Sequence, residues 1–569
     1  MPLFRQAEVR AESESERRKR KSDWREWNEE EEDEPLSLRR LCLFSVAENM
    51  RDVLFLFTAS DLIEELLRVL SQRKLLSRAA LHLLLLPQLH TLSLSHSYNL
   101  VTANLCSLIT ARCQSLKTLD LSGAQNVSSA AICSLLSDLS CLQSLSLAGT
   151  LCDSAVIVTL TQSCSLLQHL DVSRCLHLPP GALLPLALQG PKHFTSLLAL
   201  DIGLGEDEGD GPAAAAYLLL GASALQRLSI EGLGLACVII QSKDFRVTDS
   251  FSTREGVPCL GELWHATRDH KKYGLTLAEE TDESLSEEKK TMDAPVGQFK
   301  LRLREVQGLT LDSLDAVSSL CPDLRSISLN CHDHDDDDKA SSQSIHLSRG
   351  LSCWSGQLHF LSLQFSGPLS ELVAPLQVCG SSLLSLKLEG VQADGNLPLV
   401  ALLRACPKLT SLSLHMDPPH SNQEEDDSDD EDIVDWDLPF LPHLRTLTLT
   451  FSFEERQLKP VLCWTSLKRV LWSLLRGSVH LRTLSLIAAP CRLDPVFRLV
   501  LDCHAEPLRH LRRVSLQRSD VTMETATRLV DSCRHLTMLD MSKCWGLTRS
   551  NVNKLQSRRR RHKLQITWT

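Results

Sequence analysis

A leucine pattern that recurs along most of the 569-residue chain constrains the fold more than any other feature. Segments such as LHTLSLSHS at Leu89, LKTLDLSGA at Leu116 and LQSLSLAGT at Leu142 share the order L-x-x-L-x-L. If the second apolar residue of each segment is taken as a marker, the first six markers, from Leu92 to Leu228, lie 25 to 30 residues apart. This period predicts a stack of similar units and not one thick core.

Ten further markers bring the predicted strands to sixteen: Leu301, Ile327, Leu361, Leu386, Leu412, Leu447, Leu484, Val514, Leu539 and Leu564. Between markers the apolar spacing becomes helical, as in residues 128–141, where Ile132, Leu135 and Leu139 share one face and Ser128 or Ser129 caps the start. Each unit is thus a strand followed by a helix. We predict an α/β leucine-rich repeat solenoid, a horseshoe with a concave parallel sheet and outer helices, preceded by short N-terminal helices.

Changes in composition divide the chain into five parts. They are a disordered charged tail (1–34), an N-terminal helical box region (35–80), a first block of repeats (81–234), a largely disordered insertion (235–296) and a second block of repeats (297–569). Acidic loops at 331–343 and 417–438 lengthen two intervals of the second block. Such runs of charge are typical of solvated segments.

Composition and charge disfavour several classes of function. Hydrophobic residues make up 43% of the chain but aromatic residues only 5%, which suits thin leucine layers more than a compact enzyme fold. The formal net charge of −11 disfavours general nucleic-acid binding, and no apolar run is long enough to cross a bilayer. The charged N-terminus lacks the apolar stretch of a secretory signal, so we expect a cytoplasmic or nuclear location, or both.

The cysteines and histidines form no recognisable catalytic or metal-binding motif. The 20 cysteines lie singly, without C-x-x-C pairs, and we expect them to be small buried thiols in a reducing compartment. No G-x-S-x-G motif or phosphate-binding loop is found, so we expect no enzyme activity and no cofactor. The HDHDDDD run at 332–338 contains possible metal ligands, but ordering such a loop costs entropy, and we favour a solvated loop.

A short apolar helix is predicted ahead of the repeats, in SLRRLCLFSVAENM from Ser37 to Met50. Leu38, Cys42 and Val46 follow one another at intervals of four residues and so form one stripe along this helix. The stretch is separate from the leucine pattern and follows the charged tail. Its apolar stripe therefore either docks onto another protein or covers the open edge of the first repeat.

A second helix is predicted in SDLIEELLRVLS, which starts at Ser60. Its apolar face consists of Leu62, Leu66 and Val69 or Leu70, and Ser60 or Asp61 can cap its start. Two short amphipathic helices thus precede the repeats.

These features resemble known families. Single cysteines just before or after the strands, such as Cys113, Cys164 and Cys175, resemble the cysteine-containing, ribonuclease-inhibitor-like repeats. The order Leu38-x-x-x-Cys42-x-x-x-Val46 resembles the elongin BC box of VHL-box and SOCS-box proteins. Two such helices ahead of leucine-rich repeats resemble the Zyg-type and PRAME-type substrate receptors of cullin-2 ligases.

The resemblance implies a role for each helix. Leu38, Cys42 and Val46 are expected to contact elongin C, which brings elongin B with it. Leu62, Leu66 and Val69 are expected to contact a cullin, with cullin-2 favoured. The implied function is that of a non-catalytic substrate-recognition adaptor of a cullin-RING ubiquitin ligase, which binds an unknown protein substrate on its repeats. The family's apolar-proline step before the second helix is missing in FLFTAS at 55–60, which leaves the cullin's identity open.

Three other functions stay open at this point. The chain is a general protein-interaction scaffold without a ligase role if the N-terminal helices only cap the solenoid. It is an F-box-like protein if residues 60–71 bind the F-box partner instead of elongin C. It is an acidic nuclear leucine-rich protein if the run at 421–437 contacts histones.

The concave face is the expected substrate-binding surface. Strand alternation turns Leu92 inward and exposes Asp120, Asp171, Asp201 and also Asp540. A groove of small polar residues with these carboxylates suits an extended, partly basic peptide. The alternative is that the sequence LDLS is common in repeats of this kind and does not indicate a ligand.

Overall fold

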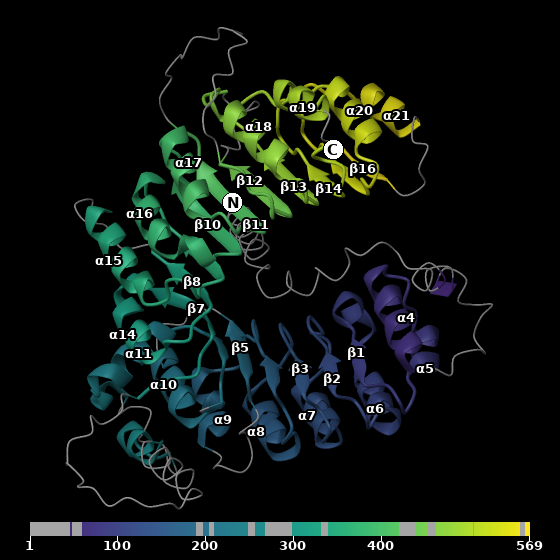
Figure 1. Cartoon of the computed structure of the whole chain (residues 1–569). Coiled ribbons are helices and arrows are strands. Elements are labelled where there is room, and N and C mark those ends of the chain that lie inside the picture. The colour runs from purple at the N-terminus through teal and green to yellow at the C-terminus, as the bar shows by residue number, and fades with distance from the viewer. Residues whose placement is uncertain are drawn as a thin grey trace, which may run out of the picture.

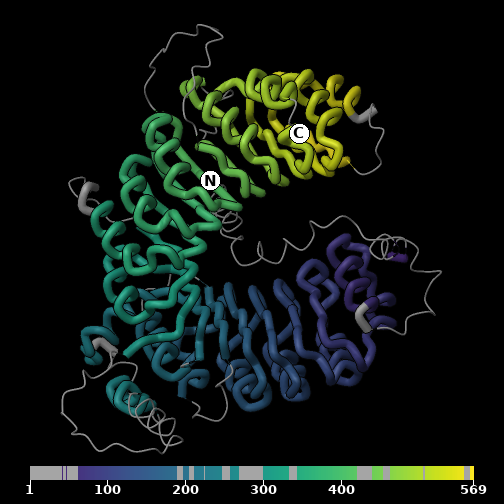
Figure 2. Tube along the Cα trace, viewed as in Figure 1, coloured from purple at the N-terminus to yellow at the C-terminus, as the bar shows by residue number. Residues whose placement is uncertain are grey.

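The computed structural model describes residues 42, 46–47, 60–188, 197–203, 210–222, 224–248, 257–267, 299–331, 340–419, 439–452, 462–503, 506–557 and 564–568. Its strands form one sixteen-stranded sheet in which every strand pairs with its neighbours in sequence order. The pairs are parallel throughout, from β1–β2 to β15–β16. Figure 1 shows the helices on the outer side of the curved sheet, and Figure 2 shows the open arc that results. The predicted leucine-rich repeat solenoid is confirmed.

The strands are short because each repeat adds only a few residues to the sheet. Their bounds are β1 Thr91–Ser93, β2 Thr118–Asp120, β3 Ser144–Ser146, β4 His169–Asp171, β5 Ala199–Gly203, β6 Arg227–Ile230, β7 Glu305–Thr310, β8 Ser326–Asn330, β9 Phe360–Gln364, β10 Ser385–Gln392, β11 Ser411–Asp417, β12 Thr446–Phe451, β13 Thr483–Ile487, β14 Arg513–Ser515, β15 Met538–Asp540 and β16 Gln565–Thr567.

The helices follow the strands on the outside of the arc. Their bounds are α4 Ser60–Gln72, α5 Arg78–Leu84, α6 Ala103–Arg112, α7 Ser129–Ser137, α8 Ser154–Ser163, α9 Leu184–Leu188, α10 Gly211–Gly221, α11 Leu233–Ser242, α14 Leu314–Leu320, α15 Ala340–Ser352, α16 Ser370–Cys379, α17 Asn396–Ala405, α18 Leu467–Gly477, α19 Asp494–Leu501, α20 Met523–Ser532 and α21 Arg549–Ser557. Short 3₁₀ turns include η2 Ser95–Leu100, η3 Pro180–Leu183 and η4 Phe245–Thr248.

Local sequence explains where several of these helices begin. The hydroxyl of Ser128 accepts the backbone N–H of Ala131 at the start of α7, as the sequence predicted. Thr102 caps α6 in the same way, and Asp153 caps α8 through two backbone N–H groups. These side chains satisfy N–H groups that have no partner within a helix.

Two strand markers are misplaced in the prediction. The structure pairs Val306, and not Leu301, with Leu228 of β6, so β7 starts four residues after the predicted marker. At the end of the sheet Ile566, and not Leu564, pairs with Leu539. In both segments the leucine pattern favours a leucine as the marker, whereas in the sheet a β-branched residue pairs with the neighbouring strand.

The predicted boundary between the first block and the insertion falls inside a helix. Helix α11 packs between α10 and α14, so the solenoid continues beyond residue 234. Part of the insertion is ordered against the repeats: the hydroxyl of Tyr217 donates to the carbonyl oxygen of Pro258 at 2.9 Å, and Trp264 is buried. Residues 1–34, 249–256 and 268–298, for which disorder was predicted, lie outside the described residues, as do 332–339 and 420–438 of the acidic loops.

The buried cysteines belong to the solenoid core. All 20 cysteines are free thiols, and Cys164 is typical: its Sγ lies 3.7 Å from the carbonyl oxygens of Leu136 and Leu139 in the preceding repeat. Burial raises the pKa of Cys164 to about 11 and that of Cys533 to about 12, so both thiols stay protonated at neutral pH. This matches the expectation of small buried thiols for those cysteines that lie in the core.

Candidate protein-interaction site at the amino-terminal end

Helix α4 covers the outer edge of the first repeat. It packs against β1 and η2, as Figure 1 shows at the purple end of the arc. Its buried face consists of Ile63, Leu66, Leu67, Val69 and Leu70, each no more than 3% exposed. The helix is amphipathic because these residues recur at helical spacing with glutamate and arginine between them. A solenoid needs such a cap at each open end, and α4 supplies it here.

A carboxylate of α4 also replaces the missing strand ahead of β1. In the second repeat, the N–H groups of Lys117 and Thr118 both donate to the carbonyl oxygen of His90, at 2.8 and 2.9 Å. Among the described residues the sheet begins at β1, and there Glu64 Oε1 accepts the N–H groups of His90 and Thr91, at 2.8 and 3.2 Å. Sequence reasoning missed Glu64, because its spacing does not distinguish it from Glu65. The only available signal was the general need of a first strand for acceptors.

The residues predicted to contact a cullin lie mainly in the cap of the solenoid. Leu66 and Val69 are 0% and 3% exposed in the solenoid core, so neither side chain is accessible to a second protein. Leu62 is half-buried and packs against the same core. Leu66 and Val69 therefore serve to cover the open edge of the first repeat. The contact with a cullin stays a prediction.

Two of the three residues predicted to contact elongin C lie among the described residues. Cys42 and Val46 are helical, and so is Ala47. Cys42 is exposed, Val46 is half-buried and packs against the core, and Ala47 is buried. Leu38 lies outside the described residues. The described residues therefore contact the solenoid at Val46 and Ala47, whereas the side chain of Cys42 is accessible.

The aspartates predicted to bind a substrate are held by the turns that follow their strands. Asp120 Oδ1 accepts from the backbone N–H of Ser122 at 3.0 Å and from its hydroxyl, and Oδ2 accepts from Ser93 of the preceding strand at 2.8 Å. Asp171 repeats this arrangement two strands further along the arc, at the end of β4.

Hydroxyl groups join these aspartates into a chain across the strands. Ser146 lies between them: its Oγ donates to Asp171 Oδ2 at 2.7 Å and lies 2.7 Å from Ser122 Oγ. The D-x-S order therefore has a structural purpose, since each carboxylate ties a strand end to the next turn and to the strand before. Binding of a substrate by Asp120 and Asp171 stays a prediction, with much of their acceptor capacity already in use.

Asp201 and Asp171 are register partners on neighbouring strands. Burial and the nearby Asp171 carboxylate raise the pKa of Asp201 to about 7, although hydrogen bonds from Gly203 and Ser229 act in the opposite direction. Asp540, which was expected to be exposed, is 7% exposed and accepts from Ser542 and from Gln517 Nε2. That expectation was wrong, because the side chain of Gln517 covers the carboxylate.

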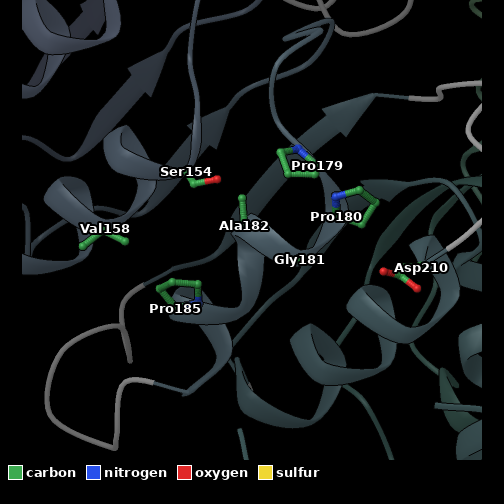
Figure 3. A pocket seen from close by; sticks show the side chains of 8 residues that line it. All are labelled: Ser154, Val158, Pro179, Pro180, Gly181, Ala182, Pro185 and Asp210. Carbon is green, nitrogen blue, oxygen red and sulfur yellow. The ribbon is translucent and has the colours of Figure 1, made fainter. Parts of the chain in front are cut away.

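A shallow hollow lies on the helix side of the arc, between the start of α8 and η3 (Figure 3). It is lined mainly by small and proline side chains: Ser154, Val158, Pro179, Pro180, Gly181, Ala182, Pro185 and Asp210. Asp210 is the only ionisable lining residue. The hollow thus lacks the converging polar groups of a small-molecule site.

Within the described residues, no three or more histidine, cysteine, aspartate or glutamate side chains are arranged to hold a metal ion. In the same part of the chain, no helix has the length and apolar character needed to cross a bilayer. The HDHDDDD run lies outside the described residues.

Comparison with known proteins places the chain by its fold. No protein-family model matches it, and no curated protein matches it. Among solved structures, it is similar to a complex of Rad7 and Elc1 from yeast, with 14% identity, a TM-score of 0.41, and coverage of 94% of this chain and 98% of that chain.

It is also similar to a Bacteroides fragilis protein, with 16% identity, a TM-score of 0.29 and coverage of 55% and 83%. A third match is the leucine-rich repeat-containing protein LegL7 of Legionella pneumophila, with 12% identity, a TM-score of 0.23 and coverage of 58% and 83%. All three TM-scores are low, and the parallel sheet itself defines the class: the chain is a leucine-rich repeat solenoid.

Proposed function

We propose that this protein is a non-catalytic adaptor whose N-terminal helix binds elongin C and whose repeats carry a protein substrate to a cullin-RING ubiquitin ligase. The supporting observation is that α4 covers the edge of the first repeat, while Cys42 ahead of it remains accessible. Helix α4 closes the edge of the first repeat through Glu64 and its buried apolar face. Cys42 lies ahead of α4 in the sequence, is helical and is exposed.

The chemistry of the box fits such a docking. A small thiol at the centre of an apolar helix face lets the helix approach a groove closely, and a leucine one turn earlier fills a pocket. Four and five residues after Cys42, the half-buried Val46 and the buried Ala47 pack against the solenoid core. The adaptor then acts by geometry, since holding a substrate near the conjugating enzyme raises the effective concentration of its lysines.

The test is co-purification with elongins B and C. The full chain is compared with a Leu38→Ala, Cys42→Phe double variant, in which the pocket-filling group is lost and a bulky ring blocks close approach. Cys353→Phe is the matched control, because Cys353 is an exposed cysteine in the second block of repeats. We expect the wild type and the control to retain both elongins and the double variant to lose them. Equal recovery from all three would reject the box.

A general interaction scaffold is the second candidate, and the burial of Leu66 and Val69 favours it. This function predicts that neither elongin is recovered with the folded wild-type chain. It also predicts that the Cys42 helix tolerates the double substitution without any change in the partners that the repeats retain. The same co-purification therefore separates the two functions.

A further inference from the structure

A row of histidines runs along one rim of the last repeats, and neither the box nor the concave aspartates involve it. Each histidine precedes, by three residues, the first residue of a strand; these first residues, Thr446, Thr483, Arg513 and Met538, are register partners. In the eleven strands from β1 to β11, the same position never holds histidine. The row, called the histidine row below, consists of His443, His480, His510 and His535.

The rings of three members of the histidine row, His480, His510 and His535, are stacked. The ring centres of His480 and His510 are 6.3 Å apart with 27° between their planes, and those of His510 and His535 are 6.3 Å apart with 14°. Arg509 Nε donates to His510 Nε2 at 3.0 Å. A hollow beside the rings is lined by Glu506, Arg509, His510, Ser532, Arg534 and His535. The ring edges, and not their faces, therefore border the open side.

Positive charge concentrates around this row. Over residues 439–557 the sequence contains 18 lysines and arginines but 9 aspartates and glutamates, whereas the whole chain has a net charge of −11. An arginine follows each of the first three histidines two residues later, at Arg445, Arg482 and Arg512. The rim is thus a line of cationic and proton-accepting groups that repeats once per strand.

We propose that the histidine row and its neighbouring arginines bind an extended, acidic segment of a partner protein. In an extended chain, alternate side chains are about 6.6 Å apart, twice the rise of ~3.3 Å per residue. This spacing matches the 6.3 Å between neighbouring imidazoles, so successive carboxylates reach successive repeats. Both faces of His510 are directed at other rings, which disfavours base stacking and so favours a peptide over single-stranded nucleic acid.

Binding to this rim depends on pH. Burial lowers the pKa of His510, and so do the neighbouring Arg509, His480, His535 and Arg482. Glu506 is the acidic group among the residues that line the hollow. Carboxylates placed along the rim favour the protonated rings, so the complex takes up protons, and affinity rises as pH falls from 8 to 6.

The experiment measures binding of a fluorescent peptide of alternating glutamate and serine, ten residues long, to the full chain at pH 6 and pH 8. The test variant carries His480→Gln, His510→Gln and His535→Gln. The matched control carries His82→Gln, His96→Gln and His346→Gln, three exposed histidines outside the row. We expect the test variant to bind at least tenfold more weakly than wild type at pH 6 and to lose most of the pH dependence, while the control binds like wild type.

Further arms separate the alternatives. A peptide of alternating glutamine and serine is expected not to bind, because it lacks the carboxylates. A ten-nucleotide oligouridylate is expected to bind more weakly than the acidic peptide. Equal binding by wild type and the test variant overturns the proposal, as does tighter, histidine-dependent binding of the oligouridylate.

If thermal unfolding shows that the triple variant is not folded, the single variant His535→Gln takes its place, with an expected loss of about threefold. Elongin recovery is independent of this outcome, because the row lies at the opposite end of the arc.

Discussion

Glu64 of α4 accepts the backbone N–H of His90 at 2.8 Å, where later repeats use the carbonyl oxygen of the preceding strand. A side chain thus takes the place of a backbone acceptor at the start of the first strand. The consequence is that two N–H groups at this edge of the sheet, those of His90 and Thr91, are already bonded and are not available to other chains. The same helix buries leucines against the repeat, so one element closes both the polar and the apolar edge.

Replacing Glu64 with alanine should loosen the first repeat. The partly buried N–H group of His90 and the exposed N–H group of Thr91 lose their acceptor, and we expect the free energy of unfolding to fall by about 1–3 kcal/mol. Glu64→Gln keeps an acceptor oxygen and should lose less. Urea unfolding measures the stability, and hydrogen exchange at His90 and Thr91 measures the local effect. Unchanged exchange at both amides in the alanine variant would contradict this role.

Leu66→Ala should destabilise the protein much more than Leu75→Ala. Leu66 is fully buried in the cap, and its truncation is expected to cost about 2–5 kcal/mol, whereas Leu75 is 48% exposed and its truncation should change stability by less than ~0.5 kcal/mol. Thermal and urea unfolding of the two variants check this. Similar stabilities for both would mean that α4 does not cap the solenoid as described.

Asp201→Asn should stabilise the protein at high pH. The pKa of Asp201 is about 7 in the folded state against an ordinary value of 3.8, so its contribution to stability is fully present below about 3.8 and is lost as the pH rises through 7. The variant has no charge to lose or gain. Its stability relative to wild type should therefore increase between pH 5 and pH 8, by on the order of 2–3 kcal/mol. Unfolding measured across this range, with the exposed Asp138→Asn as control, tests it; a flat difference would count against the shift.

Asp171→Ala should weaken the chain of hydroxyl and carboxylate groups across the first block. Ser173 loses an acceptor for its N–H and hydroxyl, and Ser146 loses an acceptor for its hydroxyl, which we expect to cost about 1–3 kcal/mol. Asp171→Asn keeps one carbonyl oxygen and should be milder. If the alanine variant unfolds like wild type in urea, the D-x-S order is not a structural device and its role as a ligand for substrates becomes the better explanation.

The repeat period and the alternation of leucines were sufficient to predict the solenoid and most of its core. Leu92, Leu119 and Leu145 are buried as expected, because an apolar residue that recurs once per turn of a stack has only the interior available. Even here, the positions of β7 and β16 depended on pairing with neighbouring strands. A leucine before Val306 fits the pattern equally well, and only the sheet selects between them.

The pattern of residues along the sequence could not predict the contacts between repeats. Strand alternation correctly turns Asp120 and Asp171 away from the core, but it does not say that Ser122 and Ser146 bridge them. Glu64 and Leu66 lie two residues apart on one helix, and the first becomes an acceptor for β1 while the second becomes core. These roles arise where α4 meets a strand more than twenty residues away in the sequence, so only the folded arrangement of the two elements decides them.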